Sequence, residues 1–179
     1  MELSVAVRER RSVRKFKGDD VSQKDLDEIM EAIRWAPSWA NTQCWDVIVV
    51  RKAEIKKRLS ETLPRSNPAR GAMTQAPVIL AVCARKGVSG FYKGEASTDK
   101  GDWFMFDIGL AVQNLCLMAH SLGLGTVIVG LFDVRKAEEI LRVPEDRSVV
   151  VLLPLGFPEG APSAPKRKGI SEFVRDENY

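Results

Sequence analysis

The chain has 179 residues, of which 45% are hydrophobic and 28% are charged, and its formal net charge is +3. This length and composition predict one globular domain over residues 1–179, with a sizeable core. The small positive charge is compatible with an anionic small ligand and does not demand a nucleic acid, and the lack of an apolar leader or membrane-spanning run favours a cytoplasmic protein with no membrane partner.

Three cysteines and one histidine give little support for a disulfide framework or a metal centre. Cys44, Cys83 and Cys116 lie far apart, their number is odd, and no pair has metal-ligand spacing. His120 is the only histidine, so a structural zinc site lacks the ligands it needs. We therefore expect reduced, mostly buried thiols and no metal.

A basic segment, Arg10-Arg11-Ser12-Val13-Arg14-Lys15-Phe16, follows a short helix predicted over residues 2–9. It places four cations and a hydroxyl in six residues, and no acidic residue occurs between Arg10 and Lys17. Forked guanidinium groups suit phosphate, and Ser12 can add a neutral donor. Taken alone, the segment is most simply a basic surface or a nucleic-acid patch.

The next helix is predicted by a capping box of Ser22 and Asp25. Its apolar residues share one face, and Pro37 ends it. The connection that follows, Pro37-Ser38-Trp39-Ala40-Asn41-Thr42-Gln43, carries short polar side chains at Ser38, Asn41 and Gln43 that can hydrogen-bond the edge of a heterocycle. Alone it is an ordinary connecting loop.

The hydrophobic pattern predicts the remaining elements. They are strands at residues 45–50, 78–82, 126–129 and 148–155, and helices at residues 53–63, 103–122 and 134–141, the last capped by Asp133.

Residues 85–101 are rich in Gly, Lys and Ser and predict a mobile loop or a short excursion. Residues 158–179 predict an arm laid on a surface rather than a second domain. The helix at 103–122 is apolar nearly all round, which predicts a subunit interface.

Three common site classes find no support in the sequence. Gly123-Leu124-Gly125 sits after a helix and before a strand, whereas a dinucleotide-binding glycine turn needs the reverse order. No Walker-type loop is present. A hydrolase triad would need His120, which lies on the apolar helix and is interpreted as a core or interface histidine.

Four motifs, in order along the chain, resemble the nitroreductase family of FMN-dependent oxidoreductases. They are Arg10-Arg11-Ser12-x-Arg14, then Ala36-Pro37-Ser38-x-x-Asn41-x-Gln43, then Leu122-Gly123-Leu124-Gly125 with a strand ending in Gly130 before Phe132-Asp133, and Leu155-Gly156-Phe157-Pro158 before a basic tail. The resemblance covers nearly the whole chain. Trp39 is bulkier than the small residue usual in the family, and Val129 stands where some relatives have an acidic residue.

The resemblance implies an α+β fold, with a central mixed, mostly antiparallel sheet flanked by helices, in an intertwined homodimer. It also implies a clamp for the FMN phosphate, made of Arg10, Ser12 and nearby Arg11, and closed from the tail by Arg167 with Lys166 or Lys168. Arg14 would lie at the pyrimidine side of the flavin and tune its chemistry. No side chain would act as a catalytic acid or base.

The flavin ring would lie between two further segments. Pro37, Ser38, Trp39 and Asn41 would come from the other subunit, with Gln43 beside them. Ile128, Val129 and Gly130 would line the opposite edge, and the N–H of Val129 or Gly130 would donate to the flavin N5. Asn67 and Arg70 are further candidates for ring contacts, without a motif of their own.

The implied activity is ping-pong hydride transfer from NAD(P)H, through FMN, to a nitroaromatic, a quinone or a similar electron-poor acceptor. Two alternatives remain open. One is a specialised flavin enzyme that removes halogen from an aromatic or fragments flavin, which a distinctive lid at residues 85–101 would favour. The other is a non-enzymatic flavin carrier or nucleic-acid binder that uses the basic segment. The physiological acceptor and the choice between NADH and NADPH are not encoded in these motifs.

Overall fold

The fold is built around a central strand that is buried from end to end. In the computed structural model, which describes residues 1–179, β2 (Val78–Arg85) is an apolar run with every residue buried except the last. Such a strand must be covered on both faces and paired on both edges. It lies between β1 (Trp45–Val50) and β6 (Arg147–Gly156), and the short β5 (Gly125–Thr126) completes the order β1-β2-β6-β5. All strand pairs are antiparallel.

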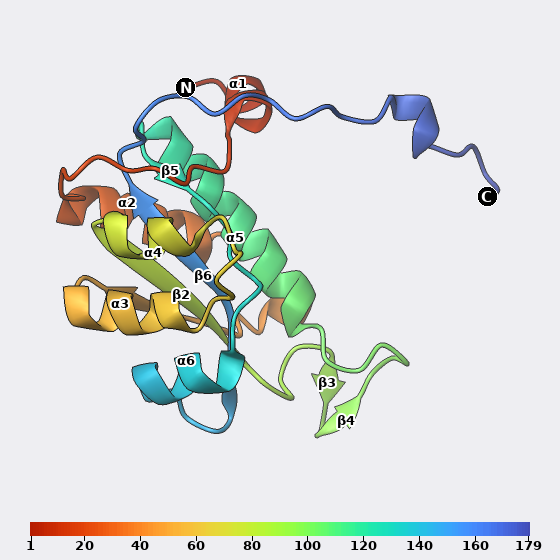
Figure 1. Ribbon diagram of the computed structural model, residues 1–179. Coiled ribbons are helices and arrows are strands. Elements are labelled where there is room, and N and C mark those ends of the chain that lie inside the picture. The colour runs from red at the N-terminus through yellow and green to blue at the C-terminus, as the bar shows by residue number, and fades with distance from the viewer.

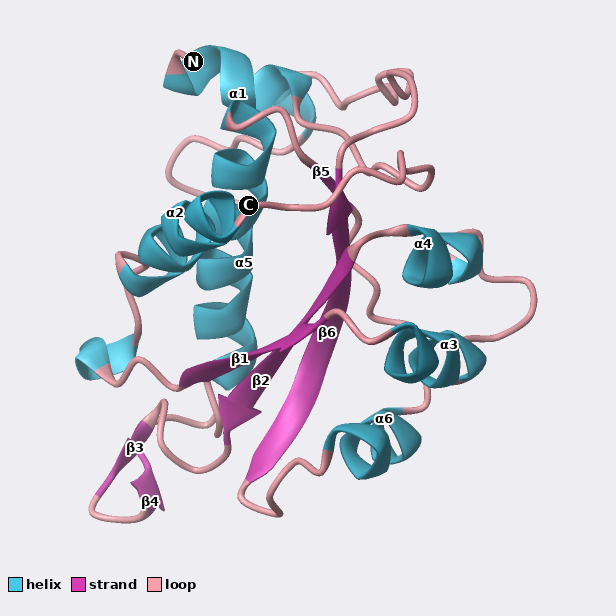
Figure 2. Cartoon of the chain, turned by 90° about the vertical axis from the view of Figure 1, so that its left-hand side faces the viewer, coloured by secondary structure: helices cyan, strands magenta, loops and turns pink.

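Helices cover both faces of this sheet (Figures 1 and 2). One face carries α2 (Gln23–Arg34) and α5 (Phe104–Ser121), with α1 (Leu3–Glu9) packed against α5. The other face carries α3 (Ala53–Glu61), α4 (Arg70–Gln75) and α6 (Val134–Leu141). Because side chains alternate along a strand, Leu80 and Val82 join the core under α2 and α5, whereas Ile79 and Ala81 join the core under α3, α4 and α6.

Most predicted elements are confirmed, and the α+β architecture is the one expected. The strand at 45–50 has the predicted bounds, and the Ser22 hydroxyl caps α2 by accepting from the Asp25 N–H at 3.1 Å. The strand predicted at 126–129 is shorter, because the chain leaves β6 after Thr126 and returns only for an isolated bridge between Val129 and Leu152. The sequence pattern did not reveal the six-residue α4.

The segment at 85–101 is an excursion with a small hairpin, β3 (Phe91–Tyr92) and β4 (Glu95–Ala96). It is tied to the body where it begins and ends. The Gly87 N–H donates to the Asp102 carboxylate at 2.6 Å, and the Trp103 N–H donates to the Ser89 carbonyl at 3.0 Å. The hairpin therefore starts from a fixed base at the N-terminal end of α5.

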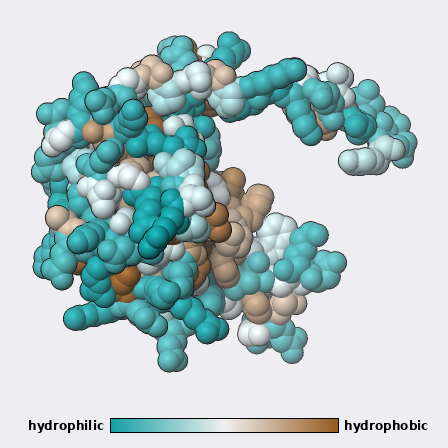
Figure 3. Space-filling view, in the orientation of Figure 1, coloured by the Kyte–Doolittle hydropathy of each residue, from teal (hydrophilic) through white to brown (hydrophobic).

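Two parts of the chain leave apolar side chains uncovered. On α5, Met105 and Phe106 are 62% and 58% exposed, so this helix is buried on its sheet side only. The tail after β6 runs away from the body as an extended arm that ends in the short turn η2 (Ile170–Glu172), and Ile170 and Phe173 are exposed there. Figure 3 shows apolar side chains over α5 facing the space between the arm and the hairpin. The predicted arm is thus present. Its first part, as far as Arg167, borders the N-terminal segment, and its end lies on no surface of its own chain. No helix combines the length and apolarity needed to cross a membrane.

Candidate functional site

The basic segment is held in place by backbone hydrogen bonds to the edge of the sheet. The Val13 N–H donates to the Thr126 carbonyl of β5 at 2.9 Å, and the Lys17 N–H donates to the Phe157 carbonyl just after β6 at 2.9 Å. Val13 and Phe16 are buried. Between these apolar anchors Arg14 and Lys15 are exposed, and before them Arg10 and Arg11 are half-buried.

Two glycines that face each other across β5 and β6 make room for these anchors. Gly125 pairs with Gly156. A Cβ on Gly125 would lie 2.6 Å from Cγ2 of Val13, and a Cβ on Gly156 would lie 2.5 Å from Cδ of Pro77 and 3.2 Å from Cδ1 of Phe16. A side chain at Gly125 would displace Val13, and one at Gly156 would collide with Pro77 and crowd Phe16, so these glycines help to fix where the arginines lie.

The arginines converge on one polar cavity of about 450 Å³. Its lining is Arg10, Arg11, Ser12, Arg14 and Arg167, with Pro162, Ser163 and Pro165 of the tail. No acidic side chain lines it, and none of the four arginines takes part in an ion pair. Guanidinium groups gathered without a counter-charge fit a dianion such as the phosphate of FMN. The tail thus meets the N-terminal segment through Arg167. Lys166 and Lys168 do not line this cavity.

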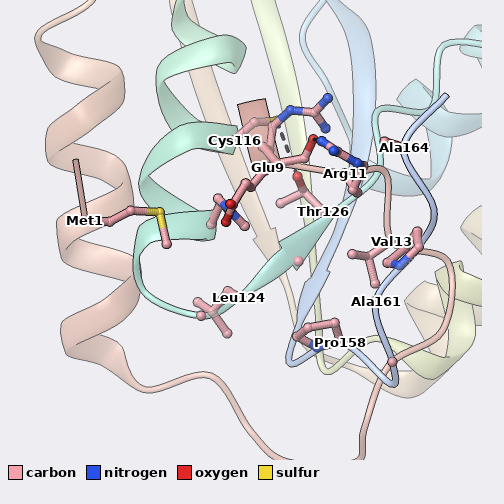
Figure 4. A pocket seen from close by; sticks show the side chains of 16 residues that line it. Met1, Glu9, Arg11, Val13, Cys116, Leu124, Thr126, Pro158, Ala161 and Ala164 are labelled. Carbon is pink, nitrogen blue, oxygen red and sulfur yellow. Dashed lines mark hydrogen bonds between the residues drawn. The ribbon is translucent and has the colours of Figure 1, made fainter. Parts of the chain in front are cut away.

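A second cavity of about 470 Å³ adjoins the first and shares Arg10 and Arg11 with it. Figure 4 shows Leu124 and Thr126 on one side of it and Ala161 and Ala164 of the tail on the other. His120 reaches its lining, and the buried Nε2 atom has no hydrogen-bond partner. Glu9 and Cys116 line the same cavity, but no group of three or more metal ligands is present, and no serine or acid is hydrogen-bonded to His120 Nε2.

The segment after β5 lies along β6, and its two candidate donors differ. The Val129 N–H already donates to the Leu152 carbonyl at 2.9 Å, and Val129 is buried. Of the two predicted donors, Val129 therefore already has a partner for its N–H within this chain, and Gly130 is the one without such a partner. Gly130 is exposed, and a Cβ there would meet no protein atom. Ile128 is 48% exposed. Asn67 stands beside this edge, since its side-chain amide donates to the Leu131 carbonyl at 3.2 Å.

The loop at residues 37–43 has an unusual backbone. Ala40, Asn41 and Gln43 all have left-handed φ values, of 42°, 56° and 47°. Each non-glycine residue in this region costs about 1–3 kcal/mol, least for asparagine, so the surroundings must hold the loop in shape. One restraint is internal, because the Ser38 hydroxyl accepts from the Gln43 N–H at 2.9 Å. Three of the predicted residues, Pro37, Asn41 and Gln43, line a separate cavity of about 370 Å³.

Sequence reasoning missed Asp107, the residue that anchors this loop. It lies in the first turn of α5 and has no exposed surface. Its Oδ1 accepts from the Trp39 N–H at 3.0 Å, and its Oδ2 accepts from the Ser89 hydroxyl at 2.6 Å and the Cys44 thiol at 3.6 Å. Burial, together with the neighbouring Asp107 charge, raises the pKa of Cys44 to about 12, so this thiol stays protonated. The available signal was an acid on an otherwise apolar helix.

Within one chain, the arginine cavity and the 37–43 loop lie at opposite ends of α5. The loop is bonded to Asp107 near the start of the helix, and the basic segment pairs with Thr126 just beyond its end. At a helical rise of ~1.5 Å per residue, Asp107 and His120 are about 20 Å apart along the axis. Figures 1 and 2 agree, since α1 and β5 stand at one end of the molecule and the β3–β4 hairpin at the other.

Comparisons with known proteins place this architecture in a family. The family model described as "Nitroreductase family" matches residues 7–157. A relative from Methanothermobacter thermautotrophicus, provisionally named NADH dehydrogenase/NAD(P)H nitroreductase, is 33% identical over 90% of this chain and 80% of its own length. The FMN reductase [NAD(P)H] of Bacillus subtilis is 34% identical over 80% of this chain and 61% of its own length.

A solved structure agrees with these sequence relatives. An FMN-dependent nitroreductase from Clostridium difficile R20291 superimposes with a TM-score of 0.78 at 25% identity, covering 97% of this chain and 98% of that chain. The superposition therefore includes almost the full length of both chains. The chain belongs to the nitroreductase family.

Proposed function

We propose that this protein uses NAD(P)H to reduce nitroaromatics, quinones or similar electron-poor acceptors through bound FMN, in a ping-pong cycle. Its family is FMN-dependent, and relatives bear the names NAD(P)H nitroreductase and FMN reductase, so the chain is an NAD(P)H-dependent oxidoreductase. The proposal adds the acceptor class, the order of events and the residues involved. The observation that carries it is the acid-free cavity lined by four arginines.

These arginines would bind the cofactor phosphate. The side chain of Arg10 makes no hydrogen bond within the chain, whereas the side chain of Arg11 donates to the carbonyls of Arg8 and Arg10. Arg10 and Ser12 would therefore supply the free donors. Arg167, whose guanidinium also donates to the Pro165 carbonyl at 3.2 Å, would bind through its remaining N–H groups, and Arg11 would add charge from a fixed position. FMN, when bound, supplies the two-electron chemistry, and the protein supplies binding, orientation and electrostatics.

Arg14 has a different place from the other three. It is exposed, and its single hydrogen bond is a long one of 3.4 Å to the Ser12 carbonyl. It lines the arginine cavity and also a second hollow next to Lys15 and Glu159. Its guanidinium is thus able to lie beside the pyrimidine edge of the flavin while Arg10 and Ser12 hold the phosphate.

A second copy of the chain would complete the site. The 37–43 loop and the arginine cavity stand at opposite ends of α5 in one chain, so both can border one flavin if two chains contribute them. The exposed Met105 and Phe106 on α5, together with the apolar residues of the arm, are surfaces that a homodimer would cover. One pocket would then receive NAD(P)H first and the acceptor afterwards, which is the reason to expect ping-pong kinetics.

Initial-rate kinetics with purified, FMN-loaded protein test the proposal. Reciprocal plots for NAD(P)H at several concentrations of a quinone or nitroaromatic should give parallel lines, because the first product leaves before the acceptor enters. Converging lines would contradict the shared pocket. Absence of turnover with every such acceptor, in protein that still holds FMN and oxidises NAD(P)H, would remove the proposed acceptor class.

A further inference from the structure

Asp107 is a buried acid that has no cationic partner. None of the protein's ion pairs includes it, and its side chain has no contact with solvent. A buried carboxylate must be stabilised by hydrogen-bond donors. Here the donors are the Trp39 N–H, the Ser89 hydroxyl and the Cys44 thiol, which belong to two different loops.

The first of these loops is held at both of its ends by this one carboxylate. Trp39 precedes the residues with left-handed φ values, and Cys44 follows them. A strained backbone persists only where its surroundings fix it. No other side chain outside residues 37–44 is hydrogen-bonded to both ends of the loop. The Asp107 carboxylate therefore sets the position of Trp39.

The second loop brings a partner for the Trp39 ring. The Trp103 N–H donates to the Ser89 carbonyl at 3.0 Å, and the Trp103 indole N–H donates to the Thr98 hydroxyl at 3.1 Å. Gly90 has a φ of 83° and touches the Trp103 ring so closely that a Cβ would lie 2.4 Å from Cδ1. The Trp103 ring is therefore fixed on one side by the excursion, and its other neighbours are Trp39 and Phe106.

These three aromatic rings form a row. The Trp39 and Trp103 centroids are 5.3 Å apart with the planes tilted by 38°, and Trp103 meets Phe106 edge-on at 5.6 Å. Phe106 is 58% exposed and Trp39 is half-buried, so the row reaches the surface. Asp107 is adjacent to Phe106 in α5, and thus one short stretch of helix carries both the end of the row and its anchor.

We propose that Asp107 is a positioning residue that fixes Trp39, and with it the row Trp39–Trp103–Phe106, as a rigid wall that selects flat, electron-poor aromatic acceptors. Electron-rich indole faces stack well on electron-poor rings, and a wall that cannot move aside excludes bulky, non-planar ones. The selectivity part rests on the proposed function, because it requires the 37–43 loop to border the flavin of the same dimer. The positioning part stands on the contacts of this chain.

The positioning part is tested on the apoprotein by near-ultraviolet circular dichroism, which reports coupled tryptophan rings. Trp39→Phe defines the signal of the Trp39–Trp103 pair. Asp107→Asn should lose most of that same signal, while Asp27→Asn, the same change at an exposed acid of α2, should keep it. An unchanged signal in Asp107→Asn would overturn the positioning role.

The selectivity part is tested on the FMN-loaded enzyme with two acceptors. With a flat nitroaromatic, Asp107→Asn should raise KM roughly three- to tenfold, the range that one aromatic pair contributes. Ferricyanide has no ring to stack, so its rate constant should match that of the wild type, as should the dissociation constant of FMN. Loss of the tryptophan signal with an unchanged nitroaromatic KM would leave Asp107 a purely structural residue and overturn the wall.

Two further outcomes are decisive. If Asp107→Asn does not fold, Ser89→Ala takes its place, since it removes one donor and keeps the bond to Trp39. A partial loss of the signal and a smaller rise in KM support the proposal, and no change in either overturns it. If the wild type reduces no aromatic acceptor, the proposed function fails, while the apoprotein signal still decides whether Asp107 positions Trp39.

Discussion

Among single residues, the arginines of the acid-free cavity carry the binding of the cofactor phosphate. Arg10→Ala should weaken FMN binding roughly tenfold or more, because a hydrogen bond to a charged group contributes about 1.5–3 kcal/mol. Titration of the apoprotein, followed by the quenching of flavin fluorescence, measures this. Arg8→Ala removes the same charge from an exposed helix position outside the cavity and should bind FMN normally. Equal affinity of the wild type for riboflavin and FMN would contradict the clamp.

Arg14 separates binding from redox tuning. Two-electron reduction places negative charge on the pyrimidine edge of a flavin, and a guanidinium there stabilises the reduced form more than the oxidised one. Arg14→Ala should therefore lower the two-electron potential, with 30 mV equal to about 1.4 kcal/mol, and slow reduction by NAD(P)H. Spectroelectrochemistry of the bound flavin measures the shift. Weaker FMN binding with an unchanged potential would make Arg14 only another phosphate ligand.

The basic motif was readable from the sequence because its neighbours along the chain define it, whereas Asp107 was not. The donors to its carboxylate lie 18, 63 and 68 residues away, so the one local signal, an acid on an otherwise apolar helix, does not reveal which groups it binds. The same reason applies to the choice between the Val129 and Gly130 donors. Whether the Val129 N–H is free depends on its bridge to Leu152, and that bridge depends on how β6 is aligned beside residue 129 in the folded chain.

At the scale of elements, β5 and the basic segment form one unit whose spacing depends on glycine. Gly125→Ala should displace Val13 and lower the free energy of unfolding by about 1–3 kcal/mol, the usual cost of overpacking. It should also weaken FMN binding, because the arginines move with Val13. Urea denaturation of the apoprotein and FMN titration measure the two effects.

Gly130→Ala is the matched control, since its added Cβ meets no protein atom and its φ is not positive. The apoprotein should keep its stability within about 0.5 kcal/mol, as for a surface substitution. FMN binding should nevertheless weaken, if the flavin lies against this backbone. Unimpaired FMN binding would place the ring elsewhere.

The helices and strands with long hydrophobic patterns were predicted, and those set by distant contacts were not. β1 has a clear local pattern, α6 has both a pattern and the Asp133 cap, and both were found at the expected residues. The six-residue α4 has no such pattern. Its C-terminal carbonyl at Ala76 is instead bound by the Lys56 ammonium from α3 at 2.6 Å. Burial of the Lys56 ammonium lowers its pKa. Because this cap is made by a residue from another helix, a local sequence pattern cannot reveal it.

For the whole molecule, the chief expectation is a homodimer of twice the 19.9 kDa chain mass, with each flavin held by both chains. Mixed dimers test this directly. One chain carries Arg10→Glu and so binds no FMN, and the other carries Trp39→Ala and has an intact arginine cavity. Dimers with one chain of each kind are isolated by two different affinity tags, and every bound flavin then sits in the cavity of the Trp39→Ala chain.

The KM of these mixed dimers for a flat nitroaromatic reveals whose Trp39 faces that flavin. If the loop comes from the partner, the flavin meets the intact Trp39 of the Arg10→Glu chain, and KM should equal that of the wild type. If the loop comes from the same chain, KM should be raised as in the Trp39→Ala homodimer. The separation of the loop from the arginine cavity along the length of α5 favours the first result, because a single chain does not bring the two together.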